Sequence, residues 1–441
     1  MNVPIRYQIG GHRAAEIAVS IETAIREGAY PAGSHLPTVR GLAANLGVSA
    51  ATVAAAYREL RVRGHVSGAG RLGTRVLSRG PMAPRGKPVL PPGVRDLAGG
   101  NPDPALLPDL AGHFASLDAD RVLYGAAPSD PELLELAADR FAADGLKPQR
   151  MAVVGGALDG IELALSGALR AGDRVAVEDP CYPSVSDLVA ALCLVPVPMT
   201  LDDRGPTPEG LDAALRSGVS ACLVTPRAQN PFGSAIDPNR AAQLRALLRD
   251  YPDVLVVEDD HAYDITVCPP ATLCDPRRAA WIQVRSVSKS LGPDLRLAVL
   301  GGDSATVARI EGRRMLGPGW VSHLLQRLVV SLWRDPETST NFKHAAATYE
   351  KRREALRAEL AAREIPSHGR SGFNVWIPVA HEDATVASLL ECGWGVLAGE
   401  RFRIRAGRAI RVTTACLDPA DAARFATDLA GALRPVPTRI G

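Results

Sequence analysis

The N-terminal part of the chain contains three segments in which apolar residues recur every three or four positions, the spacing of one face of a helix. The apolar positions are Ile17, Ile21, Ala24 and Ile25 in the first segment, Val39, Leu42, Ala43 and Leu46 in the second, and Val53, Ala56, Tyr57 and Leu60 in the third. Gly47 is expected to end the second helix, and Ser49 to cap the third. Two short helices joined by a glycine-containing turn predict a helix-turn-helix, whose second helix enters the major groove of DNA.

A glycine-rich stretch follows the third predicted helix. It reads SGAGRLGTRV and places Gly68, Gly70 and Gly73 in the order G-x-G-x-x-G, the spacing of dinucleotide-binding loops. Such a loop needs a strand before its glycines and a helix after them. Here short extended runs lie on both sides and no helix start follows Gly73, so the pattern favours a β-hairpin, the wing of a winged helix-turn-helix. A dinucleotide loop is the alternative.

The larger part of the chain alternates between apolar runs and helical stretches. The runs are MAVVGG, DRVAVED, ACLVTP, VLVVEDD, WIQVRS and LRLAVLGG. This alternation predicts an α/β domain whose mostly parallel sheet is covered by helices on both faces. Proline and glycine are frequent just before it, which indicates a linker. We therefore expect a DNA-binding module over residues 1–77, a linker over 78–95 and an α/β domain over 96–441.

Composition agrees with an ordinary globular protein, with 46% hydrophobic and 22% charged residues. No apolar run approaches the ~20 residues that span a bilayer, and the N-terminus lacks the apolar core of a signal peptide. The seven cysteines form no C-x-x-C pair, which fits reduced thiols. We expect a cytoplasmic protein that has no membrane contact.

Charge is unevenly distributed along the chain. Residues 1–80 contain ten arginines, no lysine and four acidic residues, a formal charge of +6, so the rest carries −4 of the total of +2. A basic module suits a polyanion, because arginine pairs with phosphates and displaces their counterions. A solvated basic surface would explain the charge equally well, and the helix-turn-helix pattern favours DNA.

Residues capable of cofactor chemistry follow several predicted strands. Lys289 lies just past one strand, among serines and with Arg296 seven residues on. A lysine there can form a Schiff base with an aldehyde, while serine and arginine are suitable phosphate ligands. Asp259 ends a second buried strand, where an unpaired carboxylate is costly and a protonated pyridine nitrogen would satisfy it. Asn230 follows a third strand.

Residues from about 12 to 77 resemble the DNA-binding domain of GntR-type bacterial regulators, through a Leu-Pro-x-x-Arg-x-Leu-Ala opening, a Gly-Val-Ser turn and a Gly-x-x-Gly-Thr wing. The residues that this resemblance places against DNA are Arg40, Ser49, Thr52, Arg71 and Thr74. Arg40 and Arg71 would hold phosphates, although an ordinary exposed helix charge is the alternative for Arg40. Relatives often carry arginine directly after the turn serine, whereas Ala50 follows it here, so no operator sequence is predicted.

From about Asp96 onward, the chain resembles the fold type I domain of class I and II aminotransferases, a mostly parallel mixed sheet with a smaller C-terminal α/β subdomain. That resemblance implies pyridoxal 5'-phosphate (PLP), bound to Lys289 as an aldimine, with Asp259 on the pyridine nitrogen and Asn230 on the ring hydroxyl. The implied phosphate ligands are Ser286, Ser288, Arg296 and the backbone of Gly156, Ala157 and Leu158 at a helix start. The other implied contacts are Tyr182 stacked on the ring, Tyr124 on the phosphate bound in the other subunit of a dimer, and Arg411 on a substrate carboxylate.

The implied site has ordinary alternatives and two departures. Both tyrosines suit core packing, and Arg411 suits a surface strand charge. Many relatives carry tyrosine two residues after the pyridine-binding aspartate, where this chain has His261, which either donates to the ring oxygen or is a solvated loop histidine. Phe232 replaces the commoner threonine of Asn-Pro-Thr-Gly, which suggests a differently shaped pocket there.

The two domains together resemble the MocR subfamily of regulators. The resemblance implies a homodimer that binds operator DNA and senses an amine, an amino acid or PLP itself through the large domain. The alternative is an active aminotransferase with a regulatory N-terminal module, because all the groups needed for transamination are present. The intact helix-turn-helix and the +6 charge of residues 1–80 favour the regulator.

Overall fold

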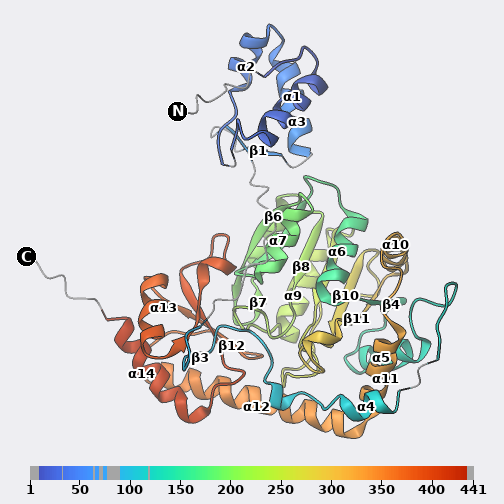
Figure 1. The fold of residues 1–441 in the computed structure, drawn as a ribbon, viewed down its shortest axis with the longest axis vertical. Helices are drawn as coiled ribbons and strands as arrows, with labels where there is room; N and C mark the ends of the chain where they lie inside the picture. The colour runs from blue at the N-terminus through green and yellow to red at the C-terminus, as the bar shows by residue number, and fades with distance from the viewer. Residues whose placement is uncertain are drawn as a thin grey trace, which may run out of the picture. The chain divides into compact units, whose positions relative to one another are not determined.

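The computed structural model describes residues 9–31, 33–62, 65–68, 73–76, 90–117 and 120–434, and these form two units (Figure 1). The N-terminal unit contains the helices α1 (Ala14–Arg26), α2 (Val39–Leu46) and α3 (Ala50–Val62) and the antiparallel strands β1 (Val66–Gly68) and β2 (Thr74–Val76). The three predicted helices are confirmed. Their buried apolar faces include Ile17, Leu42 and Val53, which pack into one core.

The turn between α2 and α3 forms as its residues predict. Gly47 ends α2 in the left-handed conformation, with φ 67°, which glycine adopts without the steric cost of a Cβ. The Ser49 hydroxyl then accepts a hydrogen bond from the Thr52 backbone N–H at 3.1 Å and caps α3.

The glycine-rich stretch lies between two paired strands. β1 and β2 are antiparallel, with Val66 opposite Val76, and a strand follows Gly73. The dinucleotide-loop alternative is therefore wrong, because that loop requires a helix there. The wing also pairs with the segment before α2, since the Leu36 N–H donates to the Thr74 carbonyl at 2.8 Å. Gly70 and Arg71 lie outside the described residues.

The large domain is built on a mixed sheet in the order β4-β11-β10-β9-β8-β5-β6-β7. Its strands are β4 (Arg150–Val154), β5 (Arg174–Asp179), β6 (Val195–Asp202), β7 (Gly205–Pro206), β8 (Ala221–Val224), β9 (Leu255–Asp259), β10 (Trp281–Ser286) and β11 (Ala298–Gly302). Pairing from β5 through β8 and β9 to β10 is parallel, and β11 is antiparallel to both β10 and β4. The mostly parallel mixed sheet is thus confirmed.

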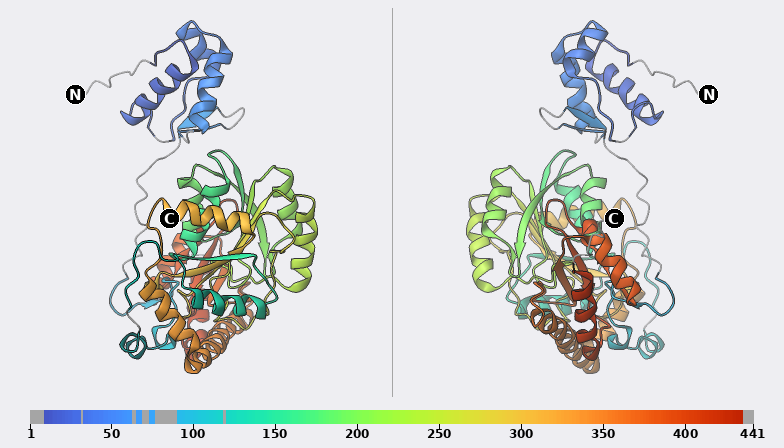
Figure 2. Two further views of the ribbon diagram at one scale, coloured as in Figure 1. Left: turned by 90° about the vertical axis from the view of Figure 1, so that its right-hand side faces the viewer. Right: turned by 90° about the vertical axis from the view of Figure 1, so that its left-hand side faces the viewer.

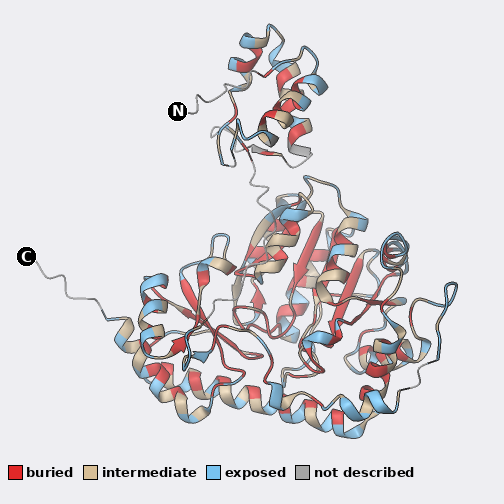
Figure 3. Cartoon of the chain, in the orientation of Figure 1, coloured by how far each residue is buried: buried red, intermediate tan, exposed pale blue. Residues whose placement is uncertain are grey.

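Helices cover both faces of this sheet, as the views in Figures 1 and 2 show. One face packs against α6 (Ala157–Ala168) and α10 (Ser304–Met315). The main apolar core lies on the other, where the helices are α5 (Pro131–Ala143), α8 (Pro208–Arg216), α9 (Pro238–Arg249) and α11 (His323–Arg334). The strands are accordingly the most deeply buried elements in Figure 3.

A smaller C-terminal subdomain follows the long helix α12 (Pro336–Ala361). Its sheet has the order β12-β15-β14, and its elements are β12 (Asn374–Pro378), α13 (Glu382–Glu391), β13 (Trp394–Gly395), β14 (Leu397–Ala398), β15 (Ala409–Thr413) and α14 (Ala422–Ala432). The short strand β3 (Arg95–Asp96) pairs in parallel with β13. Strand pairing with this subdomain thus begins at Arg95, the last residue of the predicted linker.

In the part of the chain that the structure describes, no single helix is long and apolar enough to cross a membrane.

Candidate cofactor site and DNA-binding module

The predicted cofactor residues follow strands that run in the same direction. β5, β8, β9 and β10 are mutually parallel, and β4 is parallel to β10 because β11 is antiparallel to both. Their carboxyl ends therefore share one edge of the sheet, where ligands of such sheets bind. Lys289, Asp259 and Gly156 follow or end three of these strands.

Asp259 presents a buried oxygen that is available to a ligand. Its Oδ1 atom has no hydrogen-bond partner within the described part of the chain. The other oxygen, Oδ2, lies 3.7 Å from the His261 Nδ1 atom. Because an unsatisfied buried carboxylate oxygen is costly, a protonated ring nitrogen of PLP fits this position. His261 lies beside the carboxylate, so its predicted contact with the ring oxygen stays a prediction.

Groups suited to a phosphate lie at the start of α6 and after β10. Gly156 has φ +109°, and a Cβ atom built on it would lie 3.5 Å from the Arg296 Nη2 atom. Ala157 and Leu158 are the first residues of α6, whose N-terminal N–H groups favour an anion. The hydroxyls of Ser286 and Ser288 are 2.8 Å apart. The structure thus brings Gly156 next to Arg296 and pairs the two serines, as a phosphate cradle requires.

Lys289 and Arg411 both donate to one backbone segment that the sequence did not single out. The Lys289 Nζ atom donates to the Gly100 carbonyl at 2.8 Å, and it lies 5.7 Å from the centre of the Phe373 ring. Arg411 donates through Nη2 to the Ala98 carbonyl. The run Leu-Ala-Gly-Gly, one residue after the predicted linker, was the available signal, because paired glycines often mark close backbone approach.

Arg411 is a buried residue of β15, so its reading as a surface charge is wrong. Its side chain is 3% exposed, and burial lowers its pKa to about 10. Its Nη1 atom donates to the Asn230 Oδ1 atom at 3.2 Å. This contact joins two predicted site residues that come from different subdomains.

The two predicted tyrosines are not core residues, so the alternative that both pack in the core is wrong. Tyr182 is 42% exposed and Tyr124 is 94% exposed. Tyr182 lies near Arg411. Tyr124 instead packs edge-on against Trp320, with ring centres 5.4 Å apart.

Phe232 is turned towards the C-terminal subdomain. It is buried with Trp376 and Phe402 and stacks on His368 with ring centres 4.3 Å apart. His368 in turn lies 3.3 Å from the Asp203 carboxylate. The departure from Asn-Pro-Thr-Gly therefore adds an aromatic contact between the subdomains.

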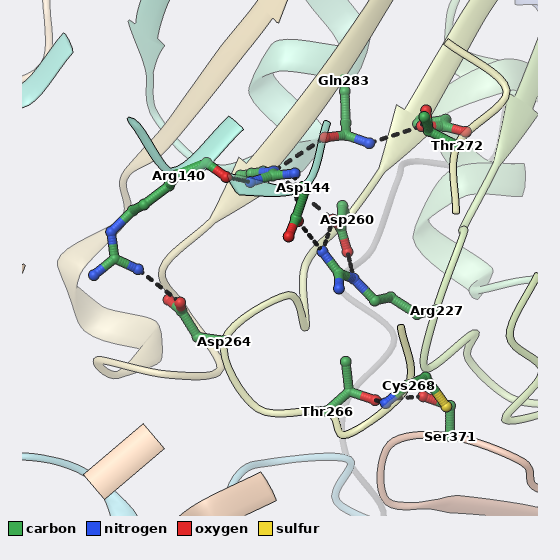
Figure 4. Close-up of polar contacts among 12 residues, drawn as sticks. Arg140, Asp144, Arg227, Asp260, Asp264, Thr266, Cys268, Thr272, Gln283 and Ser371 are labelled. Carbon is green, nitrogen blue, oxygen red and sulfur yellow. Dashed lines mark hydrogen bonds and ion pairs between the residues drawn. The ribbon is translucent and has the colours of Figure 1, made fainter. Parts of the chain in front are cut away.

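A buried ionic network lies next to the site (Figure 4). Asp260 accepts two hydrogen bonds from Arg227, at 2.9 and 2.8 Å, and Asp144 accepts one from each of Arg227 and Arg285 at 2.7 Å. The Arg227 and Arg285 guanidiniums hold the pKa of Asp260 below its usual value against the effect of burial. Successive strand residues face opposite sides, so Asp260 anchors the end of β9 while Asp259 faces the other way.

In the N-terminal unit, the predicted DNA contacts at the start of α3 lie together. Ser49 and Thr52 join their hydroxyls at 2.8 Å, and Arg40 is exposed on α2. Thr74 opens β2 of the wing and is half-buried. Arg71 lies outside the described residues.

Comparison with known proteins covers both units. Residues 13–76 match the family described as bacterial regulatory proteins, gntR family, and residues 93–429 match aminotransferase class I and II. The chain is 39% identical over 429 residues, 96% of this chain and 99% of the relative, to the vitamin B6 salvage pathway transcriptional repressor PtsJ of Salmonella typhimurium. The chain belongs to the MocR subfamily of GntR-type regulators.

This MocR-type regulator also resembles proteins with which it shares a lower sequence identity. It is 30% identical over 260 residues, 56% of this chain and 55% of the relative, to the pyridoxine biosynthesis transcriptional regulator PdxR of Corynebacterium glutamicum. The α-aminoadipate aminotransferase LysN of Thermus thermophilus, solved with N-(5'-phosphopyridoxyl)-L-leucine, has a TM-score of 0.68 at 20% identity over 78% of this chain and 92% of LysN. That likeness shows the fold.

Proposed function

We propose that this MocR-type regulator binds operator DNA through its winged helix-turn-helix and responds to PLP, which its large domain holds at Lys289. The Oδ1 atom of Asp259, which has no hydrogen-bond partner among the described residues, and the closeness of Gly156 to Arg296 support the cofactor assignment. When bound, PLP supplies an aldehyde that reacts with a lysine amine. Asp259 would hold a proton at the ring nitrogen, and Asn230 would donate to the ring oxygen. Ser286, Ser288, Arg296 and the start of α6 would hold the phosphate.

PLP itself is the effector that we propose. Arg411 does not decide between PLP and an amino acid, because its guanidinium has five N–H donors and its buried Nε–H has no partner among the described residues. A carboxylate could bind there without displacing the Ala98 carbonyl or the Asn230 amide oxygen. The relatives named for vitamin B6 salvage and pyridoxine biosynthesis point to the ligand class of PLP.

The observation that carries the proposal is the contact between the cofactor lysine and the chain that leads to the DNA-binding module. Lys289 donates to Gly100, five residues after Arg95, where the predicted linker ends. A ligand that binds Lys289 would break its hydrogen bond to Gly100. The 95–100 segment would then have one state with this bond and one without it. Differential binding of this kind couples two sites, typically by about 5- to 150-fold in affinity.

We also propose that the regulator acts as a homodimer. Fold type I sites are built across a subunit interface, which explains an exposed Tyr124 as a residue that reaches the phosphate bound in the other subunit. The exposed Leu123 and Leu316 provide apolar surface of the kind that subunit interfaces cover.

The proposal is tested with full-length protein and a labelled duplex from its own upstream region. PLP should produce a visible absorbance and change the affinity for this duplex about 5-fold or more. Lys289→Ala should abolish both effects and retain DNA binding. Lys351→Ala, which removes an exposed lysine on α12, is the matched control and should behave as wild type.

Two results would overturn the proposal. If wild-type protein binds no duplex with or without PLP, yet converts an amino acid and a keto acid, it is an aminotransferase. If DNA affinity responds to an amino acid only after PLP is bound, the effector is the amino acid and PLP is its receptor.

A further inference from the structure

Glu178 and Gln229 form a buried pair beside the proposed cofactor site. Glu178 is 4% exposed near the end of β5, and Gln229 is 1% exposed and directly precedes Asn230. One Glu178 oxygen accepts the Thr225 N–H at 3.1 Å, and the other accepts the Gln229 Nε2 group at 3.1 Å. The pair thus links the ends of β5 and β8.

Gln229 also shapes the turn that carries Asn230. Its side-chain Oε1 atom accepts the Phe232 N–H at 2.8 Å, and its Nε2 group donates to the Pro180 carbonyl at 2.8 Å. Its backbone N–H donates to the Ser234 carbonyl, and its carbonyl accepts the Gly233 N–H. The side-chain amide of Gln229 therefore holds the turn on both sides of Asn230. The orientation of that amide decides whether these hydrogen bonds form.

We infer that Gln229, oriented by the Glu178 carboxylate, is the positioning residue that sets the Asn230 amide for the cofactor ring. This inference rests on the proposed function. With its Oδ1 atom accepting from Arg411, Asn230 turns its amide nitrogen away from that arginine and keeps it as a donor for the ring oxygen. An amide has one acceptor end and one donor end, so fixing Gln229 in one orientation fixes the turn.

Glu178 can accept at both oxygens only when it is ionised, and with a pKa of about 8 it is ionised mainly above that pH. A glutamine there would direct its own NH₂ group at either the Thr225 N–H or the Gln229 Nε2 group, and both are donors. If Gln229 flipped to avoid this clash, its NH₂ group would face the Phe232 N–H instead. Glu178→Gln therefore disturbs the turn although it keeps the side-chain volume.

The thiols next to Glu178 do not change charge near pH 7, so they do not affect a titration in that range. Asp259 is the carboxylate whose charge acts on Glu178. The thiols of Cys181 and Cys222 also interact with Glu178, and burial raises the pKa of each to about 12, so they stay neutral near pH 7. Changes in that range therefore report the carboxyl groups, Asn230 and the cofactor.

The test is a pH titration of the visible absorbance of the PLP-loaded protein. A donor to the ring oxygen stabilises its negative form, so losing the Asn230 donor raises the titration midpoint. We expect Gln229→Met, which leaves Glu178 in place, and Asn230→Ala to raise the midpoint by about half a pH unit or more. The double variant should show no further shift, because one residue acts through the other.

Glu178→Gln is the second variant, and the direction of its midpoint shift distinguishes two causes. Above about pH 8, where Glu178 is ionised, loss of its negative charge near the ring would lower the midpoint, whereas displacement of Asn230 raises it. Glu258→Gln is the matched control, because Glu258 is equally buried but contacts Thr272, Leu273 and Gln283. The control should leave the midpoint unchanged.

Each remaining outcome contradicts a distinct claim. Unchanged midpoints in Gln229→Met and Glu178→Gln, or shifts that add in the double variant, would overturn the positioning role and leave the proposed function intact. A wild-type protein that gains no visible absorbance with PLP would overturn the proposed function and this inference with it.

Discussion

Glu178 gives the folded protein a specific pH dependence. Burial, partly opposed by hydrogen bonds from Thr225 and Gln229, raises its pKa from 4.5 to about 8. The folded state then holds a proton that the unfolded chain releases, so the free energy of unfolding falls as pH rises from about 4.5 to about 8. Each unit of pKa shift corresponds to about 1.4 kcal/mol.

We therefore expect the unfolding free energy of cofactor-free wild type, relative to Glu178→Gln, to decrease across this range and to level off above about pH 8. Urea denaturation at a series of pH values measures it. Asp237→Asn is the control, because its hydrogen bonds lower the Asp237 pKa and its difference from wild type should stay constant above pH 5. A constant difference for Glu178→Gln would contradict the shifted pKa.

The residues of the candidate site differ in how far sequence alone could predict them. Lys289 and Asp259 are recognisable because a lysine and an acid follow apolar strands. Gly100 and Ala98 act through their carbonyl oxygens, which every residue carries, so no side-chain pattern marks them. Glu178 lay within a predicted strand, and only its burial beside Gln229 distinguishes it from a strand-end charge.

At the scale of elements, the backbone conformation of Gly156 sets the start of α6, where we propose that the phosphate binds. Gly156 has φ +109°, and a Cβ there would lie 3.5 Å from Arg296 Nη2. Gly156→Ala should therefore weaken PLP binding about 10-fold, because alanine rarely adopts φ +109° and the start of α6 must shift beside Arg296 to relieve that strain. Gly172→Ala is the control, since Gly172 has φ +93° and its added Cβ would meet no atom of the described residues within 4 Å.

Titration of the visible absorbance with PLP measures both variants. Gly172→Ala shares the backbone strain, so it should lower thermal stability and leave PLP affinity unchanged. An equal loss of PLP affinity in both variants would show that general strain, and not the phosphate cradle, is responsible.

For the whole molecule, the segment after the linker is where the proposed cofactor site meets the chain that leads to the DNA-binding module. Gly100 has φ +64°, and a Cβ there would lie 3.2 Å from Arg411 Nη1. Gly100→Ala should displace the Lys289 contact and reduce the effect of PLP on DNA affinity to less than about 2-fold, well below the usual range of coupling. Binding of PLP should persist.

Fluorescence anisotropy of the labelled duplex, with and without PLP, measures this coupling. Gly93→Ala is the control just before this segment, because Gly93 has φ +84° and its added Cβ would meet no atom of the described residues within 4 Å. It should keep the wild-type response. A full PLP response in Gly100→Ala would exclude the 95–100 segment as the connection between the two functions.

The sequence by itself determined the two-part organisation of this regulator, because apolar periodicity and strand-end chemistry are local patterns. It identified three helices, the paired strands of the wing and six strands of the large sheet, and it predicts the lysine of the proposed cofactor site. Tertiary structure decided what those residues touch: Arg411 meets Asn230, Lys289 meets Gly100, and Phe232 packs against His368. Each of these contacts joins segments far apart in the chain, and such pairs depend on how the subdomains pack, which no local pattern encodes.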